Sequence, residues 1–401
     1  MATLPRVLLV HNAYQQRGGE DSVLESEMTL LQQQGHEVAL YRRSNDDIET
    51  MSRPELLAQT LWSTQTVRDI EQWSLRFKPD VIHVHNTLPL VSPSVFWAAG
   101  KVDVPVVQTL HNYRLACLDA TFMRNGLICE DCLGKVPWRG VMRACYRGSK
   151  LQSGAMASML VMHRAMGTFR RKVTRYIALS EFSRTKLAQA GLPPERISVK
   201  PNFLEWQDAP PQDDRSGGLF VGRLSPEKGI EALLKALSTL PSHNVRAAGS
   251  GPLADLVQQQ LGSLALGFQP LAQVMALMRS ASFMVLPSLW YEGFPRTIVE
   301  AFACGTPVLA SRLGTMAEVI EDGVTGLLFT PGDVQDIAAK LAWAQAHPAE
   351  MQAMGMAARR RYESHYVPAV NHAQLLSIYR QAITEHHTDG GRFQGLSAGT
   401  S

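Results

Sequence analysis

Long apolar runs, pairs of the Asp-x-Asp type and abundant cysteine are all missing from this chain of 401 residues. No segment approaches the ~18 consecutive apolar residues of a membrane-spanning helix. The apolar run Val7–Val10 is too short for the core of a signal peptide and predicts a buried first strand. We therefore expect a cytoplasmic protein, or one that lies on a membrane without crossing it.

Only five cysteines occur, and four of them lie within 29 residues in the spacing C-x11-C-x2-C-x12-C. Disulfides do not persist in a reducing compartment, so this spacing is compatible with a closed structural zinc site of four thiolates. One C-x2-C with two flanking cysteines is a weaker signal than two such pairs, and four reduced thiols are the alternative. The candidate ligands are Cys117, Cys129, Cys132 and Cys145.

Acidic residues are absent between Leu133 and Ser180, a stretch called here the basic segment. It holds ten of the 39 basic residues, which leaves 29 basic against 36 acidic residues elsewhere and makes the net charge of +3 strongly local. Apolar residues are interleaved with these charges, so we predict docking on an anionic membrane surface. An ordinary cationic helix, or one that grips the phosphates of a substrate, is the alternative. The apolar residues are Trp138, Val141, Met142, Met156, Met159, Leu160, Met166 and Phe169.

Strand-like and helix-like segments alternate along most of the chain, which favours an α/β protein with parallel sheets and helices on both faces. The first series of short apolar strands ends near residue 200, and a second series begins near residue 219. A stretch rich in Pro, Asp and Gly, residues 205–217, separates them and is the best candidate for a linker.

Two stretches of the second series carry the chemistry. One, from Trp290 to Phe302, holds two carboxylates eight positions apart, Glu292 and Glu300, around the start of a predicted helix at Pro295. The other, from Val221 to Gly229, places Arg223 and Lys228 on a loop between a strand and a helix. Carboxylates accept hydrogen bonds from sugar hydroxyls, whereas fixed cations and a helix N-terminus hold a diphosphate. Together these groups could bind a nucleotide-sugar.

These stretches resemble the glycogen-synthase-like family of retaining glycosyltransferases, bacterial polysaccharide-type enzymes among them. The family's Glu-x7-Glu signature is matched by Glu292 and Glu300, and its basic pair by Arg223 and Lys228. Each remaining match is weak alone, but their order and spacing are specific. They are Asn12, Gly18-Gly19, His111-Asn112, Ser180–Ser183, Pro201-Asn202 and Gly249-Ser250-Gly251-Pro252.

The resemblance implies the GT-B architecture, in which two Rossmann-like parallel-sheet domains face a central cleft and a C-terminal helix crosses back to the N-terminal domain. We expect an acceptor-binding domain over residues 1–204, a linker over 205–217 and a nucleotide-sugar domain over 218–365. The returning helix is expected over 366–388, followed by a disordered tail over 389–401 that is rich in Gly and Ser.

The resemblance also assigns roles to residues. Glu292 and His111 would contact the transferred sugar, Glu300 the ribose, and Arg223 and Lys228 the diphosphate. Without an Asp-x-Asp pair, no catalytic metal is expected. His83 and His85 share one side of a strand, but the sequence supplies no third ligand beside them, so we interpret them as structural. The other expected donor-binding residues are Gly18, Gly19, Gly251, Pro252, Gly293 and Phe294.

The family implies a hexosyltransferase that moves a sugar from a nucleoside diphosphate to an acceptor with retention of configuration. We expect a lipid-linked glycan as acceptor, in exopolysaccharide or lipopolysaccharide synthesis at the inner face of the cytoplasmic membrane, and no nucleic acid as partner. Three alternatives stay open: an enzyme with a soluble acceptor, a nucleotide-sugar epimerase of the same fold, and an inactive binding subunit. The presence of both Glu residues and both basic residues counts against an inactive binding subunit.

Overall fold

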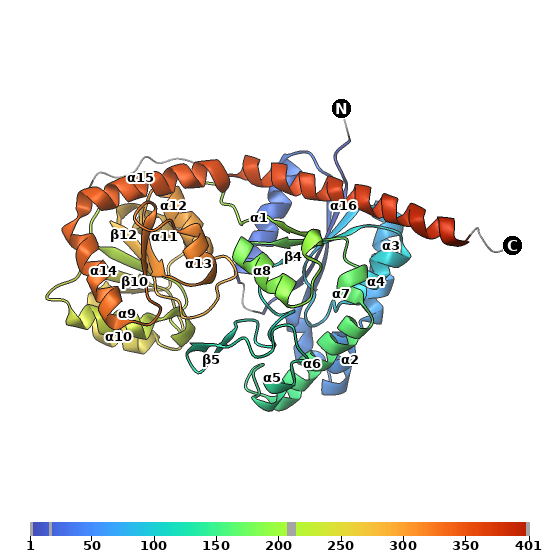
Figure 1. Cartoon of the computed structure of the whole chain (residues 1–401), viewed down its shortest axis with the longest axis horizontal. Helices are drawn as coiled ribbons and strands as arrows, with labels where there is room; N and C mark the ends of the chain where they lie inside the picture. The colour runs from blue at the N-terminus through green and yellow to red at the C-terminus, as the bar shows by residue number, and fades with distance from the viewer. Residues whose placement is uncertain (1–2, 16–17, 207–213, 398–401) are drawn as a thin grey trace. The chain divides into compact units, whose positions relative to one another are not determined.

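The computed structural model describes residues 3–15, 18–206 and 214–397. The chain forms two compact units, drawn in Figure 1. The first unit takes residues up to Ala120, then 130–201, then the chain from Asn371 onward, and the second takes 121–129 and 202–370. The expected domain of residues 1–204 was therefore wrong in two places, because residues 121–129 and 202–204 pack with the second unit.

The first unit contains a six-stranded parallel sheet in the order β2-β1-β3-β4-β7-β8. Successive side chains of a strand point to opposite faces, and the core follows this rule: Leu8 and Val10 of β1 join one apolar cluster, whereas Val7 and Leu9 join another. Both faces of the sheet are thus covered, as parallel sheets require. The strands are β1 (Val7–Ala13), β2 (Val38–Ser44), β3 (Val81–Asn86), β4 (Val106–Leu110), β7 (Arg175–Ala178) and β8 (Ile197–Val199).

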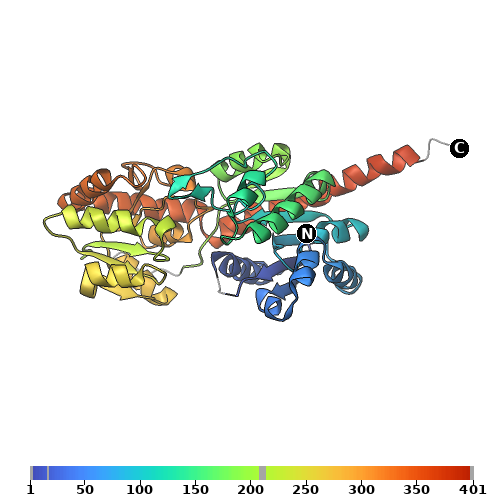
Figure 2. The ribbon, with the colours of Figure 1, turned by 90° about the horizontal axis from the view of Figure 1, so that it is seen from below.

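Different helices cover the two faces of this sheet. One face packs against α3 (Thr64–Phe77), α4 (Ser94–Lys101), α6 (Lys150–Ala165), α7 (Thr168–Arg171) and α8 (Glu181–Gln189). The other packs against α1 (Gly19–Gln33) and α16 (Pro368–Ser397), whose Leu375, Ile378 and Tyr379 are buried. Figure 1 has α16 above the sheet of this unit and α6 below it, and Figure 2, from below, has α6 in front. The expected return of the C-terminal helix to the N-terminal domain is confirmed.

The second unit repeats the architecture with the strand order β11-β10-β9-β12-β13-β14, again all parallel. Its strands are β9 (Gly218–Val221), β10 (Val245–Ala248), β11 (Ala265–Gly267), β12 (Phe283–Leu286), β13 (Val308–Ser311) and β14 (Gly326–Phe329). The helices between and after them are α9 (Ile230–Thr239), α10 (Ala254–Leu261), α11 (Leu271–Ser280), α12 (Arg296–Ala303), α13 (Gly314–Val319), α14 (Val334–Ala346) and α15 (Pro348–His365).

Shorter elements complete the fold. The first unit adds α2 (Arg53–Leu61) and α5 (Trp138–Met142), and the antiparallel pair β5 (Met123–Arg124) and β6 (Leu127–Ile128) belongs to the second unit. The Phe122 ring beside this pair meets the Tyr291 ring edge-on at 5.8 Å. Among the described residues, no helix combines the length and the apolar composition that crossing a membrane requires.

Two further sequence expectations need correction. Residues 207–213 of the expected linker lie outside the described residues, but Arg215 at its end donates to the Thr306 hydroxyl and to the Cys304 carbonyl, so it is anchored in the second unit. The tail expected to be disordered from residue 389 continues α16 as far as Ser397. Extending a helix by one residue costs far less than starting one, so the two glycines at 390 and 391 do not end it.

Candidate functional site

The strand order of the second unit reverses between β9 and β12, which are neighbours in the sheet. Parallel α/β sheets bind ligands beyond the carboxyl ends of the strands at such a point. The loop after β9 carries Arg223 and Lys228, and the loop after β12 runs from Pro287 to Pro295 and carries Glu292. The two stretches singled out in the sequence therefore leave neighbouring strands at the edge where this fold binds ligands.

Glu292 is the centre of a hydrogen-bonded cluster, and its side chain is only 7% exposed. Its Oε1 accepts from Lys228 Nζ at 2.6 Å, from Ser288 Oγ at 2.7 Å and from Trp290 Nε1 at 2.8 Å. Three donors stabilise the carboxylate charge and fix its position, and they also make it a poor nucleophile. Ser288 and Trp290 were not expected as site residues; their place directly after β12 is the only signal that sequence offers.

The two cations of the site differ in their surroundings. The Lys228 side chain is 20% exposed and lies over the Trp290 ring, 5.2 Å from its centroid. Lys228 ends the short 3₁₀ turn η3 (Pro226–Lys228), and Gly229 follows it with a φ of +70°. The position requires glycine, because a Cβ there would also lie 1.8 Å from the Pro287 carbonyl oxygen. Arg223 is exposed and forms no ion pair with the described part of the chain. Its guanidinium is available to an anionic ligand.

Glu300 lies in the second turn of α12 and is 7% exposed. Burial raises the pKa of this carboxyl, while Arg296, at 3.9 Å, lowers it in part. The preceding residues lead into the helix: the Gly293 carbonyl accepts from Thr315 Oγ1 at 3.1 Å, and Phe294 is buried with its ring 5.9 Å from that of Tyr366. These contacts fix where α12 begins.

The loop of Arg223 is hydrogen-bonded through its backbone to the loop Gly249-Ser250-Gly251-Pro252. Leu224 N donates to the Ser250 carbonyl, and Leu253 N donates to the Leu224 carbonyl, both at 2.9 Å. A Cβ on Gly251, at a φ of +156°, would lie 2.4 Å from the Leu224 carbonyl oxygen. The glycines thus allow one backbone to approach another, whereas Pro252 is exposed. Direct donor binding by Gly251 and Pro252 stays a prediction.

The first unit also has a reversal point, between β1 and β3. Asn12, near the end of β1, fixes the loops there: its Oδ1 accepts from Leu90 N at 2.8 Å, and its backbone carbonyl accepts from Asn86 Nδ2 at 2.7 Å. His111 follows β4 at the same edge and is half-buried. The structure thus places His111 beside a ligand-binding edge, and its contact with a sugar stays a prediction.

Gly18 and Gly19 begin α1 in an open position. A Cβ on Gly19 would touch nothing, and Gly18 has an extended backbone, so the fold itself does not require glycine at either residue. The first turn carries two acids: Asp21 Oδ2 accepts from Gly18 N at 2.8 Å, and Glu20 accepts from Tyr14 and Asn112. These carboxylates already occupy part of the helix N-terminus where a diphosphate was expected.

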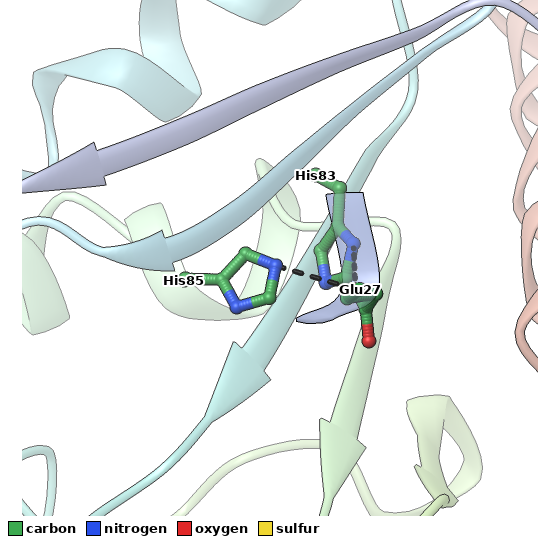
Figure 3. A group of neighbouring side chains, drawn as sticks. All are labelled: Glu27, His83 and His85. Carbon is green, nitrogen blue, oxygen red and sulfur yellow. Dashed lines mark ion pairs between the residues drawn. The ribbon is translucent and has the colours of Figure 1, made fainter. Parts of the chain in front are cut away.

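His83 and His85 have a third partner that the sequence did not supply. Glu27 of α1 reaches both of them, with its Oε1 3.1 Å from His83 Nδ1 and 3.3 Å from His85 Nε2 (Figure 3). The three ligand atoms lie within 4.8 Å of one another, close enough for a metal ion. Sequence reasoning missed Glu27 because it is 56 residues from His83 and lies on another element.

Three of the four cysteines, Cys117, Cys132 and Cys145, belong to the first unit, and Cys129 belongs to the second. All four cysteines are half-buried, and Cys145 packs partly against the first apolar cluster. Cys304, by contrast, is buried and directly follows α12. Zinc binding by Cys117, Cys129, Cys132 and Cys145 stays a prediction.

The apolar surface of the basic segment matches the expected one only in part, because Trp138, Met142 and Met166 are exposed whereas Phe169 is buried. Met156, Met159 and Leu160 of α6 are buried in the core of the first unit, so they cannot face a membrane. An amphipathic helix normally turns its apolar side to its own core, which explains the error. Near α5, the expected Trp138 and Met142 are joined by two further exposed apolar side chains, Val136 and Leu151.

Comparison with known proteins gives two family matches. Residues 18–202 match the family "Glycosyl transferase 4-like domain", and residues 206–361 match "Glycosyl transferases group 1". A glycogen synthase of Mycobacterium tuberculosis is 28% identical over 72% of this chain and 66% of its own length. An uncharacterized glycosyltransferase of Methanocaldococcus jannaschii is 35% identical over 32% of this chain. The match spans only 38% of the length of that archaeal relative.

Solved structures show the same fold. Sucrose-phosphate synthase from Thermosynechococcus elongatus superposes with a TM-score of 0.69 and 18% identity, over 95% of this chain and 99% of that one. Anabaena HepE in complex with UDP-glucose gives a TM-score of 0.61 and 20% identity, over 96% of this chain and 100% of that one. At these identities the likeness establishes the architecture alone.

Proposed function

The chain belongs to the glycosyltransferase family that combines these two domains in a GT-B fold, and on this basis we propose that it transfers a hexose from a nucleoside diphosphate sugar to an acceptor. The observation that carries the proposal is the set of groups after β9 and β12. Arg223 and Lys228 supply positive charge for the diphosphate, and Glu292 and Glu300 supply carboxylates for sugar and ribose hydroxyls.

The proposed chemistry breaks the bond between sugar C1 and the diphosphate. Negative charge develops on the leaving group, and Arg223 and Lys228 stabilise it without a metal ion. Lys228 is held by Glu292, so the cation and the carboxylate that faces the sugar form one fixed unit. We propose retention of the anomeric configuration by a front-face route, because Glu292 is engaged by three donors and is a poor nucleophile.

The proposed acceptor is a lipid-linked glycan, and the support is the basic segment. Five exposed basic residues alternate along the chain with the exposed apolar residues near α5, although Arg139 and Arg143 also pair with Asp131. Such a surface suits an anionic leaflet, so we propose peripheral binding at the cytoplasmic membrane during surface polysaccharide synthesis. The five are Lys135, Arg139, Arg143, Arg147 and Lys150. A soluble acceptor is the second candidate, favoured if this surface does not bind lipid.

A calorimetric screen of the full chain against nucleoside diphosphate sugars tests the donor. HepE in complex with UDP-glucose makes UDP-sugars the first choice. Tight binding of one donor, with formation of nucleoside diphosphate only when an acceptor is present, supports a transferase. Isomerisation of the donor without acceptor supports the epimerase alternative, and no binding of any donor supports an inactive binding subunit.

Arg223→Ala tests the site itself. Losing one preorganised stabiliser of developing charge costs ~10²–10³ in turnover. Because Arg223 is exposed, the fold should stay intact, which circular dichroism and the melting temperature check. Arg360→Ala, an exposed arginine on α15, is the matched control and should leave turnover unchanged. Near-normal turnover in Arg223→Ala would remove the diphosphate role from this residue.

A further inference from the structure

A buried chain of polar groups runs behind His111 in the first unit. His111 Nε2 lies 3.0 Å from His85 Nδ1, and the two rings stack with their centroids 5.2 Å apart. On its other side His85 Nε2 lies 3.3 Å from Glu27 Oε1. The second carboxylate oxygen of Glu27 accepts from Lys200 Nζ at 2.8 Å. The side chains of His85, Glu27 and Lys200 are at most 2% exposed.

Glu27 is the fixed negative charge of this chain. Burial alone raises the pKa of this carboxyl, but the charge of Lys200 and the neighbouring His83 and His85 rings outweigh burial and hold the pKa well below its ordinary value. Lys200 is itself fixed by Asn371 Oδ1 at 3.2 Å, at the start of α16. Glu27 is therefore a proton acceptor only, and whichever atom faces it must carry the proton.

His85 is neutral and carries a single N–H. Burial, with the neighbouring His83, lowers the pKa of His85 to about 4. Its Nε2 lies 3.3 Å from Glu27 Oε1 without hydrogen-bond geometry, and the carboxylate charge facing that nitrogen favours the tautomer with the proton on Nε2. Its Nδ1 then carries a lone pair, which can only accept a hydrogen bond from His111 Nε2.

The same reasoning assigns His111. Burial and the nearby His85 lower the pKa of His111 well below its ordinary value, so its ring is also neutral. With the proton on Nε2, the Nδ1 atom is an acceptor, and it makes no hydrogen bond to the described part of the chain. We propose that His85 and Glu27 are positioning residues that hold His111 as its Nε2–H tautomer and present His111 Nδ1 to a hydroxyl of the transferred sugar. The inference rests on the proposed function, the transfer of a sugar from a nucleoside diphosphate, with His111 beside that sugar.

A metal ion on Glu27, His83 and His85 is the competing interpretation of the same side chains. The surroundings favour a hydrogen-bonded network, because an ammonium group already occupies the Glu27 carboxylate. Both ring nitrogens of His83 also have partners, with Nδ1 2.7 Å from the Tyr379 hydroxyl and Nε2 2.8 Å from Thr109 Oγ1. A divalent cation on Glu27 Oε1 would lie beside the buried Lys200 ammonium on Oε2 of the same carboxylate, and the two positive charges would repel each other.

The first readout is NMR of the full chain labelled with ¹⁵N-histidine, which reports the tautomer of each ring without any substrate. The His111 signals are assigned by their loss in His111→Asn. We expect Nε2–H with an unprotonated Nδ1 in the parent chain, and a mixture of tautomers in His85→Met, which can neither donate nor accept. A unique and unchanged His111 tautomer in His85→Met would overturn the proposal.

His85→Gln is the conservative variant, because its amide N–H donates to Glu27 while its carbonyl oxygen accepts from His111. We expect it to keep the Nε2–H tautomer and to retain turnover within about threefold, whereas His85→Met loses about 10–100-fold in kcat, the typical effect of removing an orienting partner. KM for the donor should change little, because the diphosphate and ribose contacts are elsewhere. Equal kcat in His85→Met and the parent chain, with an altered tautomer, would also overturn the proposal.

Glu27→Gln with Lys200→Met removes the charged pair together, so that neither partner is left buried alone. This double variant should show the same mixture of tautomers. Arg175→Met is the matched control, since Arg175 is another buried cation of the first unit paired with an α16 carboxylate, Glu385, at 2.7 Å. It should alter stability but not the His111 signals. One metal ion per parent chain that is lost in His83→Gln would overturn the proposed positioning role of His85 and Glu27 in favour of a metal site. Absence of donor binding in the parent chain would instead overturn the proposed function alone.

Discussion

At the scale of single residues, Glu300 combines burial with a role that needs its charge. Its raised pKa means that, between the ordinary carboxyl pKa and the raised one, the folded chain holds a proton that the unfolded chain has released. Stability therefore falls as pH rises through that window, and above the raised pKa the full cost of the buried charge is present. Donor affinity should show the opposite trend and weaken as pH falls through the raised pKa.

Glu300→Gln separates these two effects. Removing the charge relieves the cost of burial, so the melting temperature at pH 7 should stay equal or rise. A hydrogen bond to a charged group contributes ~1.5–3 kcal/mol, so donor affinity should fall about 10–100-fold in calorimetry. Glu363→Gln, an exposed residue on α15, is the control and should change neither quantity. Unchanged donor affinity in Glu300→Gln would remove its ribose role.

Whether a site residue could be predicted from the sequence depends on how far it lies along the chain from its partners. Glu292 and Glu300 could be found because they lie only eight positions apart in one segment of the chain. The Ser288 and Trp290 donors lie within four residues of Glu292 and could have been suspected, but only side-chain geometry shows that both reach Oε1. Glu27 and Lys200 are 173 residues apart, and no local pattern reports their pairing.

At the scale of elements, substitutions of Gly251 and Gly19 test whether each glycine is needed by the fold or by a ligand. Gly251→Ala places a Cβ against the Leu224 backbone at a positive φ, and we expect destabilisation of about 2 kcal/mol or more, seen in denaturant or thermal unfolding. Gly19→Ala meets open space and should leave stability unchanged. If the donor approaches the backbone at Gly19, the donor affinity of the Gly19→Ala variant should nonetheless fall. Loss of stability in Gly19→Ala would instead assign it to the fold.

The cysteine segment makes a second prediction at this scale. If its four thiolates hold a structural zinc, elemental analysis should find about one zinc per chain, and prolonged chelation should lower the melting temperature. Brief chelation should leave transfer intact, because Arg223 and Lys228 stabilise the diphosphate without a metal. Cys129→Ser should lose the zinc, and Cys304→Ser, outside the segment, should keep it. A purified protein without zinc would retire the site.

The elements themselves were accessible from sequence because their period is short. Alternation of apolar strands and amphipathic helices predicted both parallel sheets, since a buried parallel strand is apolar on both faces. The same local signal failed for α6, whose apolar side was predicted to face a membrane and instead packs on the sheet. Periodicity identifies an apolar face but not what covers it. Residues 121–129 failed for the same reason, because their packing partners lie in the second unit.

At the scale of the whole molecule, charge is distributed unevenly between segments. The chain has a net charge of +3, yet outside the basic segment acidic residues exceed basic ones by seven. Not all ten basic residues of that segment can act at a surface: Arg175 is buried against Glu385, and Asp131 pairs with Arg139 and Arg143. The charges that remain exposed without an acidic partner in the described residues include Lys135, Arg147 and Lys150.

Co-sedimentation with liposomes tests whether this surface docks on a membrane. Binding of the full chain should rise with the fraction of anionic lipid and fall with salt, because exposed charges are screened over ~10 Å at 0.1 M. Each basic residue near an anionic leaflet contributes ~1 kcal/mol, so Arg147→Glu with Lys150→Glu should weaken the partition at least about 30-fold. Trp138→Ala with Met142→Ala should weaken it without altering the salt dependence, since it removes only exposed apolar area.

The control for this experiment changes the same amount of charge elsewhere. Lys235→Glu with Arg360→Glu alters two exposed basic residues of the second unit, on α9 and α15, and should bind liposomes as the parent chain does. If both double charge variants weaken binding equally, net charge rather than this surface determines it. Binding that ignores lipid charge and salt, or no binding at all, contradicts electrostatic docking. The lipid-linked acceptor would then lose its main support, and the soluble acceptor would become the better hypothesis, while the donor site after β9 and β12 would be unaffected.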